Sequence, residues 1–244
     1  MAGNTVKSSP KMSVAALRAE VTRLQQQLEE AERRNSMLLS RLQHRVRNTL
    51  AIIRSVARRT AQASCTVEDF QAHLDARLSA IARAQTMALR DAGESLSLDQ
   101  LLGEELLAHA AHEGEQVSLD GPAVRLGFAV AGPLGLAIHE LVANAVKHGA
   151  LSVPQGRIKV SWQMEAGQDQ DGPGPALCLD WQETGVPTAG PAPRRRGFGT
   201  EMIEQTLPYE LGATASLGFG PDGVQCTIIL PVTVNVTLDV QAPP

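Results

Sequence analysis

A heptad pattern constrains the first part of this chain more than any other feature. From residue 14, mostly apolar side chains recur at alternating steps of three and four residues, as in the seam of a two-stranded coiled coil. The seam comprises Val14, Leu17, Val21, Leu24, Leu28, Ala31, Asn35, Leu38 and Leu42. Asn35 occupies an a position, where a buried amide fixes register and strand number. The pattern predicts a parallel homodimer, and the alternative is one long helix packed on its own domain.

The seam changes phase after Leu42, because the next apolar seam residue is Val46, four positions later. Such a stutter locally unwinds a coiled coil. His44 lies beside it, off the seam, and is expected to face solvent. A second helix is predicted to begin at the cap residue Thr66. Its apolar stripe is Phe70, Leu74, Leu78, Ile81 and Leu89, so two helices per chain would form a four-helix bundle in the dimer.

After Gly93 the pattern alternates between helix and strand, which predicts an α+β domain. Helices are expected at 98–111, 132–148 and 200–207, and strands near 116–119, 157–164, 177–183, 213–219 and 224–230. Residues 165–175 have the composition of a hairpin loop. The predicted organisation is a disordered tail at 1–11, coiled coil and dimerisation helices at 12–93, a catalytic domain at 94–232 and a C-terminal tail at 233–244.

Composition narrows the functional classes. The 244 residues are 43% hydrophobic, enough for folded cores, and the net charge of −4 gives no general reason to bind nucleic acid or an anionic membrane. The three cysteines lack a metal-binding or disulfide spacing, which favours a reducing cytoplasm. The most apolar stretch, 129–146, is interrupted by His139, Glu140 and Asn144, so direct membrane insertion is not expected. An external signal would have to reach this chain through an upstream sensor protein.

The helix expected at 132–148 carries a polar face. Glu140, Asn144 and Lys147 or His148 recur at steps of three and four residues and therefore lie on the same side. This side of the helix therefore carries an acid, an amide and a base. A packed helix with an ordinary solvated face remains the alternative for this segment taken alone.

A second set of residues suits phosphate binding. Gly197 and Gly199 flank Phe198 just before Thr200 opens a helix, which leaves backbone N–H groups accessible. The preceding segment, 184–193, is rich in Gly, Pro and Ala and ends in three arginines, 194–196. It has the composition of a flexible lid whose basic residues reach a polyphosphate, or else of a solvated charge run.

These segments, in this order, resemble the HWE-type sensor histidine kinases over about residues 41–231. His139, Trp181 and Glu183 match the His of the N-box and the Trp-x-Glu that name this family. The resemblance implies an α/β-sandwich ATP-binding domain of the Bergerat type, with ATP and Mg²⁺ as cofactors. It also implies autophosphorylation of a histidine, followed by transfer to an aspartate of a response regulator receiver domain.

The resemblance implies a role for each matched position. Asn144 would bind Mg²⁺, and Lys147 and His148 would contact phosphate or ribose. Glu183 would lie at the adenine edge, where Gly185 allows close approach. The phosphoacceptor would be His44, in a segment similar to the family's HRxxN box. The other implied ATP-site residues are His139, Trp181, Arg196, Gly197, Phe198 and Gly199.

The proton on His44 needs a base. Many related kinases place an acid next to the phosphoacceptor, but here the next residue is Arg45, a permanent cation. Glu140 is the best candidate, because it lies one helical turn from Asn144. Its alternative role is a carboxylate that pairs with a nearby cation. The other histidines, 73, 109 and 112, are expected to be surface residues.

Two departures from the family pattern concern the later part of the domain. Val186 and Pro187 stand where relatives often have another glycine, and Pro208 is expected to end the last helix early.

Two other functions fit the pocket. One is a non-catalytic dimeric adaptor with a degenerate ATP pocket, and the other is a serine kinase of the anti-sigma-factor type. Intact Glu140, Asn144 and Lys147 argue against the first, and the His44 segment argues against the second.

Overall fold

The computed structural model describes residues 14–90, 95–109, 111, 114, 116–169, 172–186, 197–220, 222–232 and 236–238. The tail expected at 1–11 and most of the lid expected at 184–196 lie outside these residues. The chain divides into two compact units, residues 1–50 and 51–244. The long helix α1 (Val14–Ala63) contributes to both units. The predicted division at residue 93 stays a prediction.

The described part of the first unit is helical throughout. The helix continues through the stutter between Leu42 and Val46 without a break. All the leucines and valines of the seam up to Leu42 are at least 50% exposed. An apolar stripe of this length on an exposed helix is the surface that a second helix covers in a coiled coil.

The second unit begins with the end of α1 and with α2 (Val67–Arg90). The predicted cap is confirmed, because the backbone N–H of Asp69 donates to the Thr66 hydroxyl over 3.1 Å. Of the predicted stripe on α2, Ile81 is fully buried. The residues that bury completely beside it are small: Ala80, Ala84 and Ala88. This narrow face allows α2 to pack closely on the rest of the unit.

A five-stranded sheet forms the centre of the second unit, in the order β2-β4-β5-β7-β6. The strands are β2 (Val117–Asp120), β4 (Arg157–Asp169), β5 (Gly172–Thr184), β6 (Thr214–Gly220) and β7 (Gly223–Pro231). β2 pairs parallel to β4, and the other neighbours are antiparallel. Alternation along β4 buries Ile158, Val160 and Trp162 and exposes the residues between them or leaves them half-buried, so one face of the sheet meets the core.

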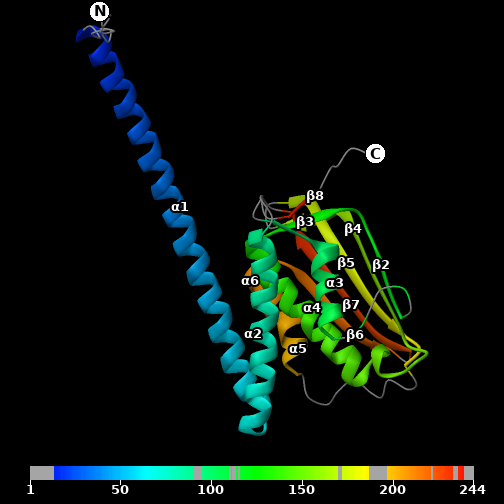
Figure 1. Ribbon diagram of the computed structural model, residues 1–244. Helices are drawn as coiled ribbons and strands as arrows, with labels where there is room; N and C mark the ends of the chain where they lie inside the picture. Colours follow the sequence, from blue (N-terminus) through cyan, green and yellow to red (C-terminus); the bar gives the residue numbers. More distant parts are fainter. Residues whose placement is uncertain are drawn as a thin grey trace, which may run out of the picture. The chain divides into compact units, whose positions relative to one another are not determined.

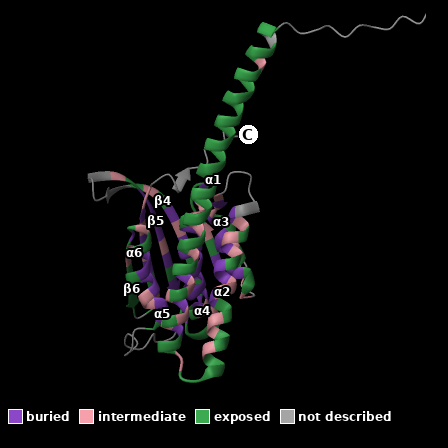
Figure 2. Ribbon diagram, turned by 90° about the vertical axis from the view of Figure 1, so that its left-hand side faces the viewer, coloured by how far each residue is buried: buried purple, intermediate pink, exposed green. Residues whose placement is uncertain are grey.

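Helices cover that face (Figure 1). They are α3 (Leu98–Ala108), α4 (Phe128–His148), α5 (Phe198–Glu201), the π-helical turn η2 (Met202–Thr206) and α6 (Leu207–Leu211). The buried residues lie between helices and sheet (Figure 2). α4 is long and apolar enough to cross a membrane, but 78% of its apolar window is buried, as in the core helix of a folded domain. The expected α/β domain after N-terminal helices is therefore confirmed.

Several details differ from the sequence predictions. A second sheet, β1-β3-β8, was not predicted; its strands are Ser95–Ser97, Val124–Gly127 and Val236–Leu238. Three or four residues are too few to show a period, and β8 falls in the predicted tail. β4 and β5 remain paired from Glu165 with Ala176 to Asp169 with Gly172. Most of the segment that was expected to be a loop is therefore paired strand. Continued backbone pairing outweighs a turn-like composition there.

The last helical segment also differs. Pro208 does not end it, since helix continues through η2 and α6 to Leu211. Pro208 lies in the first turn of α6, directly after the π turn. At this point the ladder of hydrogen bonds is already shifted, so a missing N–H is tolerated. The helix expected at 98–111 ends earlier, at Ala108.

Candidate functional site

A cavity of about 740 Å³ lies among α2, α4, the end of β5, the start of α5 and strands β6 and β7. This volume is typical of a small-molecule site. The predicted residues that line it are His139, Glu140, Asn144, Lys147, His148, Glu183, Gly197, Phe198 and Gly199. Three segments far apart in the sequence thus converge on one space.

The cavity has two kinds of wall. α4 supplies Asn144, Lys147 and His148, which are exposed at its last turns. Val186, Leu217, Phe219 and Val224 supply an apolar wall from the sheet side. A ligand with a flat apolar end and a charged end matches this division.

Both carboxylate oxygens of Glu183 accept hydrogen bonds. Its Oε2 accepts from the backbone N–H of Ala150 over 2.8 Å, and its Oε1 accepts from the indole of Trp181 over 3.1 Å. Burial raises the pKa of the Glu183 carboxyl, and these two hydrogen bonds act in the opposite direction. Trp181 itself is completely buried and does not line the cavity. Its role here is to orient Glu183.

Gly149 leaves the space that Glu183 occupies. A Cβ at this position would collide with Oε2 of Glu183 and lie 2.8 Å from Cα of Ala145. Gly149→Ala is therefore expected to destabilise the fold by about 1–3 kcal/mol through overpacking. Thermal unfolding measures the effect. The matched control is Gly103→Ala in α3, where a Cβ meets nothing within 4 Å and a stabilisation of roughly 0.5–1 kcal/mol is expected. Equal melting temperatures for the two variants would contradict the packing argument.

The glycines around Phe198 differ in what they do. A Cβ on Gly199 would lie 3.1 Å from Nδ2 of Asn144 and 3.3 Å from Glu140, so this glycine lets α5 approach the polar face of α4. Gly197 has open space around it.

Gly185 does not line the cavity. It adopts a φ of 74° and lies against the carbonyl of Gln155, so its close approach is to the chain itself.

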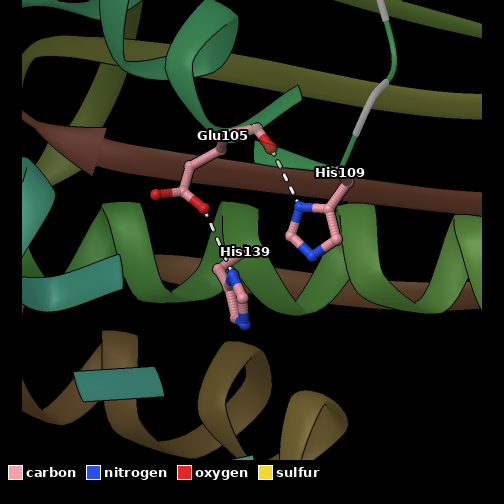
Figure 3. Close-up of side chains that lie close together, drawn as sticks. All are labelled: Glu105, His109 and His139. Atoms are coloured by element: carbon pink, nitrogen blue, oxygen red, sulfur yellow. Dashed lines mark hydrogen bonds and ion pairs between the residues drawn. The ribbon is translucent and has the colours of Figure 1, made fainter. Parts of the chain in front are cut away.

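His139 belongs to a buried polar network (Figure 3). Its Nδ1 lies 3.2 Å from Oε2 of Glu105, and Nδ1 of His109 lies 2.9 Å from the carbonyl of Glu105. Arg83 donates to both oxygens of Glu105. Burial alone would raise the pKa of Glu105, but the bonds with His139 and Arg83 lower it. Glu105, His109 and His139 together have the composition of a cation site. However, Arg83 already neutralises the Glu105 carboxylate.

Sequence reasoning missed four of these residues. His109 and His73 were expected at the surface, but both line the cavity, and Nε2 of His73 lies 3.4 Å from Nζ of Lys147. Arg77 and Glu105 were not considered. The only local signal was the four-residue spacing of Glu105 and His109, and nothing marked α2 as part of the site. Arg196 and His112 lie outside the described residues.

His44 belongs to the first unit, where it is exposed on α1 as predicted. Its Nδ1 lies 3.4 Å from Nδ2 of Asn48, one helical turn away. A polar partner on one ring nitrogen fixes the tautomer and so defines the role of the other. The four-residue spacing of His and Asn in the HRxxN box thus places the two side chains within contact distance on the helix.

Comparisons with known proteins indicate a histidine kinase family. The family model for HWE histidine kinase matches residues 41–123. Blue-light-activated histidine kinase 1 of Erythrobacter litoralis is 33% identical over 210 residues, covering 83% of this chain and 56% of the relative. The blue-light-activated histidine kinase of Rhizobium johnstonii is 30% identical over 204 residues, covering 84% and 56%. The chain spans about half the length of these relatives.

A solved structure shares the fold. The blue-light activated histidine kinase EL346 of Erythrobacter litoralis superposes with a TM-score of 0.50 at 24% identity, covering 79% of this chain and 62% of that one. The residues that name the family, His139, Trp181 and Glu183, belong to the cavity or support it directly. The chain belongs to the HWE histidine kinase family.

Proposed function

We propose that this protein is an ATP-dependent histidine kinase that phosphorylates His44 and passes the phosphoryl group to an aspartate of a response regulator. One observation carries the proposal: most of the residues that the family resemblance assigns to ATP line a single cavity. Its apolar wall suits an adenine ring, and its polar wall suits phosphates. Phosphoryl transfer depends mainly on positioning and charge neutralisation, which such a cavity supplies.

The donor set fits a magnesium nucleotide. Asn144 presents an amide to the cavity, beside the space that Gly199 leaves open. The Asn144 oxygen would hold Mg²⁺, while Lys147 and His148 would neutralise phosphate charge and Glu183 would contact the adenine edge. Bound Mg²⁺ would supply positive charge that offsets the negative charge of the phosphates. In the transfer step a neutral His44 nitrogen bonds to the γ-phosphorus, the bond to the β,γ-bridging oxygen breaks and ADP leaves. The imidazole proton passes to Glu140.

Incubation with γ-phosphate-labelled ATP tests the function. A phosphohistidine is labile in acid and stable in base, whereas a phosphoserine is stable in acid. Acid-labile label on the purified chain would support the histidine kinase. Acid-stable label would point to the serine kinase, and no label with bound ATP would point to the non-catalytic adaptor.

Asn144→Ala tests the metal assignment. The side chain is exposed to the cavity, so the fold is expected to remain intact while one metal ligand is lost. We expect Mg²⁺-dependent labelling to fall by a factor of about 10² or more, in line with the loss of a group that stabilises transferring charge. Initial rates over a Mg²⁺ titration measure it. Undiminished labelling at low Mg²⁺ would remove Asn144 from the metal site.

The exposed seam on α1 leads us to propose a parallel homodimer. We expect sedimentation to give a dimer at micromolar concentration. Leu24→Lys, which places a charge on the seam, is expected to yield monomer, because a desolvated lysine opposes seam packing. Gln26→Lys, off the seam on the same helix, is the control. A wild-type monomer would contradict the assembly.

The remaining partners are proposed from the family. A response regulator receives the phosphoryl group, and an upstream sensor protein supplies the signal. Two relatives are named for activation by blue light. A cytoplasmic location is consistent with Cys65, Cys178 and Cys226, which are all free thiols.

A further inference from the structure

Among the described residues of the second unit, three ion pairs join the paired helices to the α/β domain. They are Arg59 with Glu201 at 3.2 Å, Arg77 with Glu140 at 2.7 Å and Arg83 with Glu105 at 2.8 Å. Every arginine comes from α1 or α2, and every glutamate comes from α3, α4 or α5. The two surfaces are therefore complementary in charge.

Arg77 makes the most extensive of these contacts. Its Nε and Nη2 donate to the two oxygens of Glu140 over 2.7 and 3.3 Å, and its Nη1 donates to the Thr60 hydroxyl over 3.0 Å. Its guanidinium carbon also lies 3.6 Å from the centre of the Phe198 ring. The side chains of Arg77 and Glu140 are each only 9% exposed. One residue thus binds α1, the polar face of α4 and the glycine-flanked Phe198.

This arrangement conflicts with the role of Glu140 as a base. Both carboxylate oxygens accept hydrogen bonds from the same buried guanidinium, so a histidine that approaches Glu140 has to compete with Arg77 for the carboxylate. Phe198 is likewise covered by Arg77, although its segment is the one expected to close on the phosphates. In the observed arrangement Arg77 thus occupies both the carboxylate of Glu140 and one face of Phe198.

We propose that Arg77 is a latch, meaning that its contacts with Glu140, Thr60 and Phe198 hold α2 on the cavity and keep Glu140 out of the reaction until they break. The proposal rests on the proposed function and concerns its regulation. The composition of the buried face of α2 favours separation of α2 from the cavity. It is formed largely by Ala80, Ala84 and Ala88, so separation exposes less apolar area than a leucine face would. The ion pairs supply much of the specific attachment.

Arg77→Gln tests the latch. Loss of one partner leaves the Glu140 charge buried and uncompensated, which favours separation of α2 from α4. We expect backbone amides of α2 to exchange hydrogen at least about tenfold faster, and His44 to be labelled at least about tenfold faster at saturating ATP. The matched control is Arg58→Gln, which removes an exposed arginine of α1 and should change neither quantity.

Unchanged exchange in α2 would overturn the latch. Faster exchange without faster labelling, in a protein whose wild type is labelled, would overturn its regulatory role. A wild type that takes no label would instead contradict the proposed function, and the exchange comparison would still decide whether Arg77 holds α2.

A cross-link covers the case in which Arg77→Gln does not fold. An ideal Cβ on Gly135 lies 2.9 Å from Cβ of Ala84, so Ala84→Cys with Gly135→Cys can form a disulfide after a small shift. Cys65→Ser removes the exposed thiol. We expect the oxidised protein to be labelled at least about tenfold more slowly than the same protein after reduction, since α2 cannot leave α4. Equal rates would overturn the proposal.

Discussion

Labelling by γ-phosphate-labelled ATP is expected to disappear when His44 is replaced by alanine. The side chain is exposed on α1, so its loss removes the nucleophile without a change in any core. Acid-labile counts on the purified chain measure the effect. The control is Gln43→Ala, the neighbouring exposed position on the same helix, which should be labelled like the wild type.

Two other histidines are alternative phosphoacceptors that this experiment tests. His73 and His148 line the cavity itself, so either could in principle meet the γ-phosphate. Label that persists in His44→Ala and maps to one of them would show that the phosphoacceptor is misassigned. Nucleotide binding should be the same in His44→Ala and wild type, because the substitution leaves every residue that lines the cavity unchanged.

Glu140→Gln is expected to slow autophosphorylation by roughly 10² to 10⁴, the range for loss of a general base. Glutamine keeps the size and polarity of the side chain, so nucleotide affinity should be retained. Single-turnover labelling at saturating ATP measures the rate, and calorimetry measures the affinity. Glu104→Gln in α3 is the control, because Glu104 is an exposed carboxylate away from the cavity.

The outcome also separates the base from the latch. Glu140→Gln weakens the contact with Arg77 and removes the base, so α2 should loosen while the rate still falls. Arg77→Gln loosens α2 with the base intact, and the rate should rise. If the Glu140→Gln variant were labelled within a factor of about three of wild type, Glu140 would not be the base.

The sequence alone determined the features that depend on local periodicity. The steps of three and four residues predicted α1 and α4 and placed Glu140 and Asn144 on one face, because neighbours on a helix surface are set by the helical repeat. The Thr66 cap was equally predictable, since the hydroxyl satisfies an N–H three residues away. The ordered residues His139, Trp181 and Glu183 were enough to indicate the family.

Only the tertiary structure decided which distant residues complete the site. Arg77 and Glu140 are 63 residues apart, and Glu105 and His139 are 34 apart. No local pattern marks such pairs, because they arise from how α2 and α3 pack on α4. The short strands β1, β3 and β8 depend in the same way on their neighbours for hydrogen bonds. Periodicity therefore predicted which face of α4 is polar, and packing determined that a buried arginine of α2 contacts that face.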